Sequence, residues 1–320
     1  MRLLVYFAPK LALALVTMLG VSVLVFLALR FLPGGYADIL LGPFATPDAR
    51  KVIAERYGLD QPMIVQYGRW LLAMSQGDFG VSMVTRRSVI AEFLRRAPVT
   101  LELASLSLGL VLLVGVPLGV AAGAAASDRP QGGLARLVGA LGASVPDFVL
   151  GSALIFVFSV WSLWLRVGGY VPFFDDPVTN MRVMILPTVT LSVFGIALVL
   201  RTTRDAVLRV MTEGYITAAV ARGENPRNII RLHVLRNAAI PVVTVVTTYF
   251  GFLLGGAVVV EVLFSIPGVG LYAFNGLLNR DYAIVQTGVL LAAAVFIAIN
   301  MLADLLYAII DPRIGSGSGR

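Results

Sequence analysis

The stretch Tyr215-Ile-Thr-Ala-Ala-Val-Ala-Arg-Gly223, followed directly by Glu-Asn-Pro-Arg-Asn-Ile-Ile-Arg-Leu-His-Val-Leu235, says more about the fold than any other part of this sequence. Apolar residues recur every three or four positions up to Gly223, which predicts a helix that ends at this glycine. Asn225 is a favourable N-cap and Pro226 suits the first position of a helix, so a second, short helix is expected from Pro226 to about Leu235. Two helices that meet at a glycine without a linker must turn sharply.

Charges on the two expected helices follow opposite patterns. Asp205 and Glu213 each lie four positions from Arg209, which favours one helix through this region with two ion pairs of opposite charge. Arg227 and Arg231 instead form a like-charge pair at the same spacing on the second helix. Unmatched arginines beside apolar side chains are typical of a docking element for an acidic partner, whereas anionic lipid headgroups would attract the same charges. The spacing alone does not choose between these two interpretations.

On both sides of this loop the chain is strongly apolar. Hydrophobic residues make up 58% of the 320 residues, charged residues only 13%, and the mean hydropathy is +0.88. A soluble domain carries roughly twice this share of charge, so the polar surface is too small to cover a globular core. Apolar stretches long enough to cross a membrane occur six times, at Leu11–Leu32, Val99–Ala124, Leu137–Leu163, Met184–Leu200, Ile240–Leu263 and Ile284–Ile310. The predicted fold class is an all-α polytopic membrane protein with six transmembrane helices.

The distribution of positive charge predicts how these helices are oriented. With both termini in the cytoplasm, thirteen basic residues lie on the inner side, against three in the short outer loops, Arg166, Arg182 and Arg280. The chain then divides into residues 1–32 (an N-terminal segment and the first helix), 33–97 (an external segment), 98–310 (the other helices and a cytoplasmic loop at 201–239) and 311–320 (a cytoplasmic tail).

Several classes of site are excluded by composition. The chain has no cysteine, which excludes disulfides and thiolate metal sites, and His233 is its single histidine, which excludes a multi-histidine metal site. Neither Lys10 nor Lys51 follows a glycine, so the phosphate-binding loop of P-loop ATPases is absent. His233 is expected to belong to the fold of the cytoplasmic loop rather than to bind a ligand.

Glycines in the second apolar stretch predict a close helix contact. Gly115, Gly119 and Gly123 recur at four-residue spacing, which places them on one helix face and lets another helix approach. Pro117 lies between them and should kink the helix. Packing within the bundle is the favoured interpretation, and a moving joint that lines a pathway is the alternative.

Carboxylates within or near apolar stretches are candidate functional groups, because charge is costly in a bilayer. Glu102, Glu261 and Asp304 are expected to make interfacial or interhelical bonds. Asp147 follows Pro146, so we expect it in a kinked, partly opened helical turn. It is the candidate pathway-lining charge, which could meet a peptide amino group or a metal cation.

The cytoplasmic loop resembles the EAA loop of ABC-importer permeases, in the version found in B-type subunits of the dipeptide/oligopeptide/nickel permease family. Other segments resemble that family in the same order: Gly58-Leu-Asp-Gln-Pro62, Gly77-Asp-Phe-Gly-Val-Ser82, Pro98-Val-Thr-Leu-Glu-Leu103, Gly256-Ala-Val-Val-Val-Glu261, Phe264-Ser-Ile-Pro-Gly-Val-Gly270 and Asn279-Arg-Asp-Tyr282. Each piece is weak alone, but the ordered set extends over most of the chain. Thr217 departs from the general signature, which has Glu there.

The resemblance implies a type I ABC importer permease fold with an EAA coupling loop and a small external insertion between helices 1 and 2. It implies four kinds of partner in a prokaryotic inner membrane: a second homologous permease, two cytoplasmic ATPase subunits, an external substrate-binding protein and the membrane lipid. No nucleic acid is expected to bind. The chain itself is expected to be neither an enzyme nor a cofactor-binding protein, with ATP and Mg bound by the ATPase subunits. Di- or oligopeptides are the expected substrates.

The resemblance also implies which residues couple transport to ATP hydrolysis. The small residues of the EAA signature fall on Ala218, Ala219 and Gly223, and the coupling helix falls on residues 225–236. The expected coupling set is Ala218, Ala219, Gly223, Asn225, Pro226, Arg227, Arg231 and Arg236.

Other functions remain open from the sequence. A secondary transporter or a channel not coupled to ATP has the same hydropathy, although the internal repeat typical of secondary transporters is not evident. An intramembrane aspartyl protease would need Asp147 and Asp304 at one site. Nickel, a glutathione-like compound or another small solute could be imported by the same machinery, and the second permease could be a different chain or a second copy.

Overall fold

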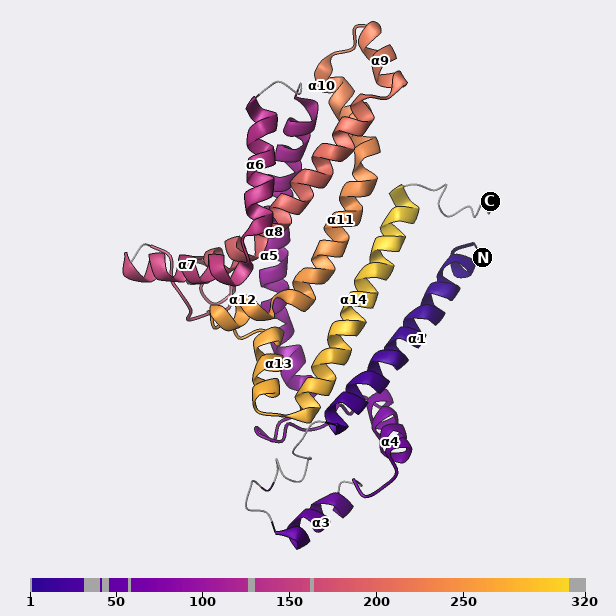
Figure 1. The fold of residues 1–320 in the computed structure, drawn as a ribbon, viewed down its shortest axis with the longest axis vertical. Coiled ribbons are helices and arrows are strands. Elements are labelled where there is room, and N and C mark those ends of the chain that lie inside the picture. Colours follow the sequence, from indigo (N-terminus) through magenta and orange to yellow (C-terminus); the bar gives the residue numbers. More distant parts are fainter. Residues whose placement is uncertain are drawn as a thin grey trace. The chain divides into compact units, whose positions relative to one another are not determined.

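The computed structural model describes residues 2–31, 41, 46–56, 59–125, 130–161 and 164–310 (Figure 1). The predicted tail at 311–320 and parts of the external segment 33–97 lie outside the described residues. Every long element within the described ranges is helical, which confirms the predicted all-α class. The helices are α1 (Arg2–Arg30), α3 (Pro47–Arg56), α4 (Met63–Ser75), α5 (Val89–Ala124), α6 (Pro130–Ser144), α7 (Asp147–Val160), α8 (Pro177–Met211), α9 (Gly214–Ala221), α10 (Pro226–Asn228), the π-helix η1 (Ile229–Val234), α11 (Leu235–Gly256), α12 (Val258–Leu263), α13 (Val269–Leu278) and α14 (Tyr282–Ile310).

Five helical segments in the described ranges are long and apolar enough to cross a membrane, rather than the six predicted. They are Ala8–Arg30, Val89–Ala124, Pro177–Met211, Pro226–Gly255 and Tyr282–Leu305. The second begins ten residues before the expected Val99, and the third extends well beyond the expected Met184–Leu200 at both ends. Helices that continue past the apolar region explain both differences, because hydropathy detects only the part of a helix that suits a bilayer.

The third predicted helix, Leu137–Leu163, is wrong as a single element. The structure ends α6 at Ser144 and begins α7 at Asp147, and Figure 1 shows α7 lying across the direction of α6. Pro146 has extended backbone (φ −63°, ψ 140°) and cannot donate a backbone hydrogen bond, so it stops α6 completely instead of kinking it. The fifth predicted helix is likewise divided, since α11 ends at Gly256 and the short α12 follows.

Contacts divide the chain into two compact units. The first unit comprises the described residues within 3–98 and 271–295, and the second comprises those within 99–270 and 296–310. In the first unit, apolar side chains of α1, α4 and α14 form one core around Val25, Leu29 and Leu290. The ring of Phe26 contacts the rings of Tyr67 and Trp70 at 5.4 and 5.6 Å between centroids, so α4 packs on α1.

Helix α8 is the centre of the second unit. Within its most apolar window 67% of the residues are buried, against 33% for α5. Asp176 caps its N-terminus, accepting hydrogen bonds from the backbone N–H groups of Val178 and Thr179 at 3.1 Å each, and Pro177 occupies the first position. Around α8 lie α6, α7 and α11 (Figure 1).

The glycine face of α5 packs directly on α8, as the spacing predicted. A Cβ atom at Gly119 would lie 2.5 Å from Thr203 Cβ, and one at Gly123 would lie 2.7 Å from Val207 Cβ. Gly115 also faces α8, because a Cβ atom added there would lie 3.2 Å from a backbone oxygen of α8. At positions 119 and 123 any larger residue would force α5 or α8 to shift, so this face is a packing surface. Helix α5 continues through Pro117.

Candidate functional site

The loop after α8 contains two helices separated from α8 by a break that the sequence did not predict. Helix α8 ends at Met211, and Glu213 has extended backbone (φ −73°, ψ 142°) as the N-cap of α9. Arg209 and Glu213 therefore do not share a helix, and the predicted ion pair between them is wrong. Asp205 instead pairs with the adjacent Arg204, with 3.0 Å between Nη1 and Oδ1.

Gly223 ends α9 as predicted. It has φ +78°, a left-handed conformation that glycine adopts at little cost. Its N–H donates to the Val220 carbonyl (2.9 Å), and the Glu224 N–H donates to the Ala219 carbonyl (3.2 Å). These two bonds are the Schellman pattern, which satisfies carbonyls at the helix end and reverses the chain direction.

The next helix begins at the predicted residues but does not end where predicted. Asn225 Oδ1 accepts a 3.0 Å hydrogen bond from Arg227 N, and Pro226 occupies the first position. The helix passes through the π-helical turn η1 and continues as α11 to Gly256, so the predicted end near Leu235 is wrong. The apolar residues after Leu235 continue the helical pattern. Instead of a break, the chain forms the wider π-helical turn η1, in which each turn holds more residues than in an α-helix.

A small apolar core holds this loop against the ends of α5 and α8. Ala219 of α9 (1% exposed) and Ile229 and Val234 of η1 are buried against Ala206 and Val207 of α8. The small side chain at 219 lets α9 approach this core. Ala218, in contrast, is exposed.

The arginines of the loop are exposed. Arg227, Arg231 and Arg236 all face solvent, and Leu232 between them is 64% exposed. Leu232 thus adds one exposed apolar side chain to a surface whose other members are cationic. This surface, Arg227, Arg231, Leu232 and Arg236, is called the arginine face below.

Glu224 joins the two helices of the loop. Its carboxylate accepts from Arg222 Nη2 at 2.9 Å and contacts His233 Nε2 at 3.1 Å. The Arg222 guanidinium, and next the His233 ring, hold the pKa of the Glu224 carboxyl below its ordinary value of 4.5. His233 thus belongs to the fold of the loop, as expected. Asn237, near the start of α11, also donates to Tyr215 Oη of α9 at 3.0 Å.

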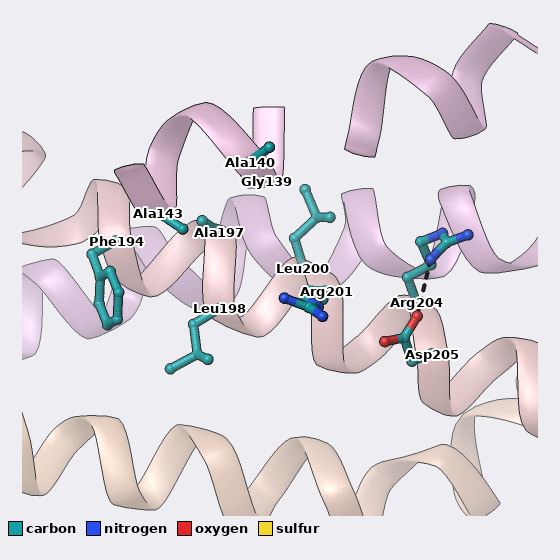
Figure 2. Close-up of a pocket in the computed structure, with 10 residues that line it drawn as sticks. All are labelled: Gly139, Ala140, Ala143, Phe194, Ala197, Leu198, Leu200, Arg201, Arg204 and Asp205. Carbon is teal, nitrogen blue, oxygen red and sulfur yellow. Dashed lines mark hydrogen bonds and ion pairs between the residues drawn. The ribbon is translucent and has the colours of Figure 1, made fainter. Parts of the chain in front are cut away.

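A groove of about 430 Å³ lies between α6 and α8 in the second unit (Figure 2). Small residues of α6, including Ala140 and Ala143, form one wall, and Phe194 and Leu198 of α8 form another. Figure 2 shows Arg201 and the paired Arg204 and Asp205 farther along α8, toward one end of the groove. No group of three or more potential metal ligands occurs among the described residues.

Asp147, the candidate pathway residue, is not brought to the arginine face. It lies in the first turn of α7, half-buried, where the helix N-terminus favours a carboxylate. Figure 1 shows α7 far along α8 from α9 and α10. The structure therefore separates the sequence-predicted residues into a loop set and one distant carboxylate.

These features agree with one family. The family model described as "Binding-protein-dependent transport system inner membrane component" matches residues 115–316, and the model of its N-terminal part matches residues 3–104. The chain belongs to this family. It is a multi-pass, non-catalytic permease subunit of a binding-protein-dependent ABC importer.

Relatives of this permease cover nearly its whole length. A "Probable peptide ABC transporter permease protein" of Sinorhizobium fredii is 37% identical over 97% of this chain and 99% of its own. A "Putative peptide transport system permease protein" of Brucella abortus is 38% identical over 95% and 97%. The "Glutathione transport system permease protein" of Salmonella typhimurium is 39% identical over 93% and 94%.

A solved structure has the same fold over part of the permease. It is an inward-facing crystal form of the MetNI methionine ABC transporter, with a TM-score of 0.56 at 19% identity. The match covers 69% of this chain and 97% of that one.

Two carboxylates expected to make interhelical bonds do so. Glu102 accepts from Tyr170 Oη and Asn180 Nδ2 at 2.7 Å each. Glu261 is fully buried and accepts from Thr100 Oγ1 at 2.6 Å. Sequence reasoning had proposed these bonds without naming their partners.

Sequence reasoning missed the role of Asp281. It is fully buried and accepts from Ser82 Oγ (2.7 Å) and from the backbone N–H of Met83 (2.8 Å). Its signals were its place in the segment Asn279–Tyr282, which resembles the family, and its position just before the sixth apolar stretch, where an N-cap is expected.

Proposed function

We propose that this permease imports peptides, with di- or oligopeptides as the main substrates. An external binding protein delivers them, and a second homologous permease subunit completes the translocation pathway. The peptide-transport names of the Sinorhizobium and Brucella relatives, at 37% and 38% identity over nearly full length, support this substrate class. Glutathione, itself a tripeptide, is the second candidate, because the Salmonella glutathione permease is equally similar at 39%.

In this proposal the chain crosses a prokaryotic inner membrane six times, with both termini in the cytoplasm. The five long apolar helices make five crossings, and α6 with α7 makes the third. Fifteen residues of α6 extend about 22 Å, which is less than the roughly 30 Å hydrocarbon core. Because α7 lies across α6, the chain between α7 and the start of α8 is proposed to complete the crossing, and residues 33–97 form the external insertion of a type I importer.

The arginine face is proposed as the docking surface for one of two cytoplasmic ATPase subunits, which bind ATP and Mg. The observation that carries this proposal is the continuous helix from Pro226 to Gly256. Because α10, η1 and α11 share one helical backbone, a force on Arg227 is transmitted directly into a membrane-spanning helix. The buried core around Ala219 and Ile229 keeps α9 attached to this helix during the movement.

Reconstitution tests the proposal. The permease would be co-purified with its second permease and ATPase subunits, placed in vesicles and supplied with the cognate binding protein. Uptake of a labelled tripeptide should require both ATP on the side of the arginine face and the binding protein. Labelled glutathione and nickel, measured in parallel, identify the substrate class. Uptake driven by an ion gradient without ATP would overturn the proposal.

A further inference from the structure

The groove between α6 and α8 is chemically two-sided. Its long section is apolar and is lined by Ala140 and Ala143 of α6 and by Phe194 and Leu198 of α8 (Figure 2). The section toward the end of α8 carries the guanidinium groups of Arg201 and Arg204. A ligand that matches this groove has an apolar chain and an anionic head.

The charged section of the groove has unmet hydrogen-bonding capacity. Arg204 donates from Nη1 to Asp205, but its Nε atom is buried and has no acceptor among the described residues. Arg201 is exposed and also has no hydrogen-bonding or ionic partner within the described ranges. Two arginines against one aspartate leave a net positive charge, and an anion placed there would gain charge-assisted hydrogen bonds.

The length of the groove matches one leaflet of a bilayer. Phe194 and Asp205 are eleven positions apart on α8, which is about 16 Å along the helix. Half of a hydrocarbon core is roughly 15 Å. Arg201 directly follows Leu200, the last residue of the expected apolar stretch, so the guanidinium groups lie where the headgroups of a leaflet begin.

We propose that this groove binds one anionic phospholipid of the cytoplasmic leaflet. The phosphate lies between Arg201 and Arg204, and one acyl chain follows Phe194 and Leu198 along the small residues of α6. Basic sites between membrane helices on the cytoplasmic side suit anionic headgroups. The proposal rests on the orientation given under Proposed function, which places this end of α8 inside the cell.

The test uses the assembled transporter in nanodiscs that contain phosphatidylglycerol and phosphatidylcholine with the same palmitoyl and oleoyl chains. Native mass spectrometry measures which lipid is retained after mild delipidation. Arg201→Gln should lower the preference for phosphatidylglycerol about fivefold, and Arg201→Gln with Arg204→Gln about thirtyfold. Arg209→Gln removes an exposed charge from the same helix outside the groove, and should leave the preference unchanged. Equal losses in Arg209→Gln and Arg201→Gln, or no loss in the double variant, would overturn the proposal.

A second variant covers the case in which the double variant does not assemble. Asp205→Asn removes the competing carboxylate and should raise the phosphatidylglycerol preference about fivefold. An unchanged or lowered preference would contradict the proposal. Ala143→Trp fills the apolar section and should reduce retention of both lipids, because it excludes the acyl chain.

Soluble competitors distinguish a lipid from other anions. Inorganic phosphate and glycerophosphoglycerol carry the anionic group without acyl chains, and neither should displace the bound lipid at millimolar concentration. Displacement by either would show a simple anion site instead. If a partner subunit covers the groove in the assembled transporter and no lipid is retained, the groove is a protein contact. That result would also overturn the proposal. Lipid retention needs neither ATP nor peptide, so failure of peptide uptake alone would count against the proposed function and not against this site.

Discussion

Ser82 Oγ donates a 2.7 Å hydrogen bond to Asp281 Oδ2, joining two segments 199 residues apart in the sequence. Both residues are buried, at 1% and 0% exposure. The same carboxylate oxygen accepts from Met83 N at 2.8 Å, and Asp281 directly precedes Tyr282, the first residue of α14. One carboxylate therefore fixes the start of α14 to the turn that precedes α5 in the first unit.

Asp281→Ala should destabilise the first unit by about 1–3 kcal/mol, because the buried donors of Ser82 and Met83 lose their acceptor. The change should appear as a lower melting temperature of the purified transporter and as faster amide exchange at residues 82–84. Asp78→Ala is the matched control, since Asp78 is exposed and accepts one local bond from Gly80 N at 2.9 Å. Equal effects of the two substitutions would contradict the anchoring role of Asp281.

The α5–α8 contact predicts a position-dependent effect of adding a methyl group. Gly119→Ala should cost about 1–3 kcal/mol, because its Cβ would overlap Thr203 and the Leu200 carbonyl. Gly119→Leu should disturb folding and transport more strongly. Gly109→Ala lies on the same helix with open space around its Cβ, and alanine favours helix, so it should be neutral or mildly stabilising. Thermal melts of the three variants in one detergent provide the comparison, and unimpaired Gly119→Leu would disprove the tight contact.

Local patterns predicted the local features of this chain well. The helix stop at Gly223, the start at Asn225 and Pro226, and the close glycine face of α5 all follow from short-range chemistry. Such features depend on backbone conformation and neighbouring side chains, which a sequence contains directly. Apolar composition likewise indicated membrane helices correctly, because burial in lipid needs only length and hydropathy.

The sequence could not predict which distant segments meet. The motif segments around Thr100 and Glu102 resembled a family, but their contacts with Glu261 and with Tyr170 and Asn180 depend on tertiary packing. Pro146 shows the complementary problem. A proline permits either a kinked helix or two helices, and only the surrounding packing of α6 and α7 on α8 decides between them.

The buried carboxylate of Glu261 leaves no room for a methyl group at Gly268. The added Cβ in Gly268→Ala would collide with the buried Glu261 carboxylate, which already accepts from Thr100. Either the carboxylate or the loop must move, so the melting temperature should fall and amide exchange after α12 should rise. Gly255→Ala, with open space at its Cβ, is the control and should change little. A normal melting temperature for Gly268→Ala would show that the carboxylate can relax without cost.

Glu224 predicts a pH dependence of the cytoplasmic loop. Its pKa is lowered in the folded loop by Arg222 and His233, so its contribution is fully present above the ordinary value of 4.5 and is lost as pH falls through the lowered value. The protection factors of amides 219–235, which are corrected for the intrinsic pH dependence of exchange, should therefore fall below pH 4.5 and stay constant just above it. Glu224→Gln should abolish this change and exchange faster at neutral pH. If the loop of the Glu224→Gln variant showed the same loss of protection at low pH, the pH dependence would come from titratable groups other than Glu224.

The arginine face gives the most direct test of coupling. Arg227→Glu combined with Arg231→Glu reverses two exposed charges without touching the buried core around Ile229, so membrane insertion and the melting temperature should be retained. Contact with an acidic partner groove should be lost, and binding-protein-dependent peptide uptake should fall at least about tenfold, as loss of roughly 1.4 kcal/mol of interface energy would produce. Arg227→Lys with Arg231→Lys keeps the charge and should retain most of the uptake, whereas Arg209→Glu controls for charge reversal outside this face. Normal uptake by the double glutamate variant, with ATPase subunits still bound, would remove Arg227 and Arg231 from the coupling surface.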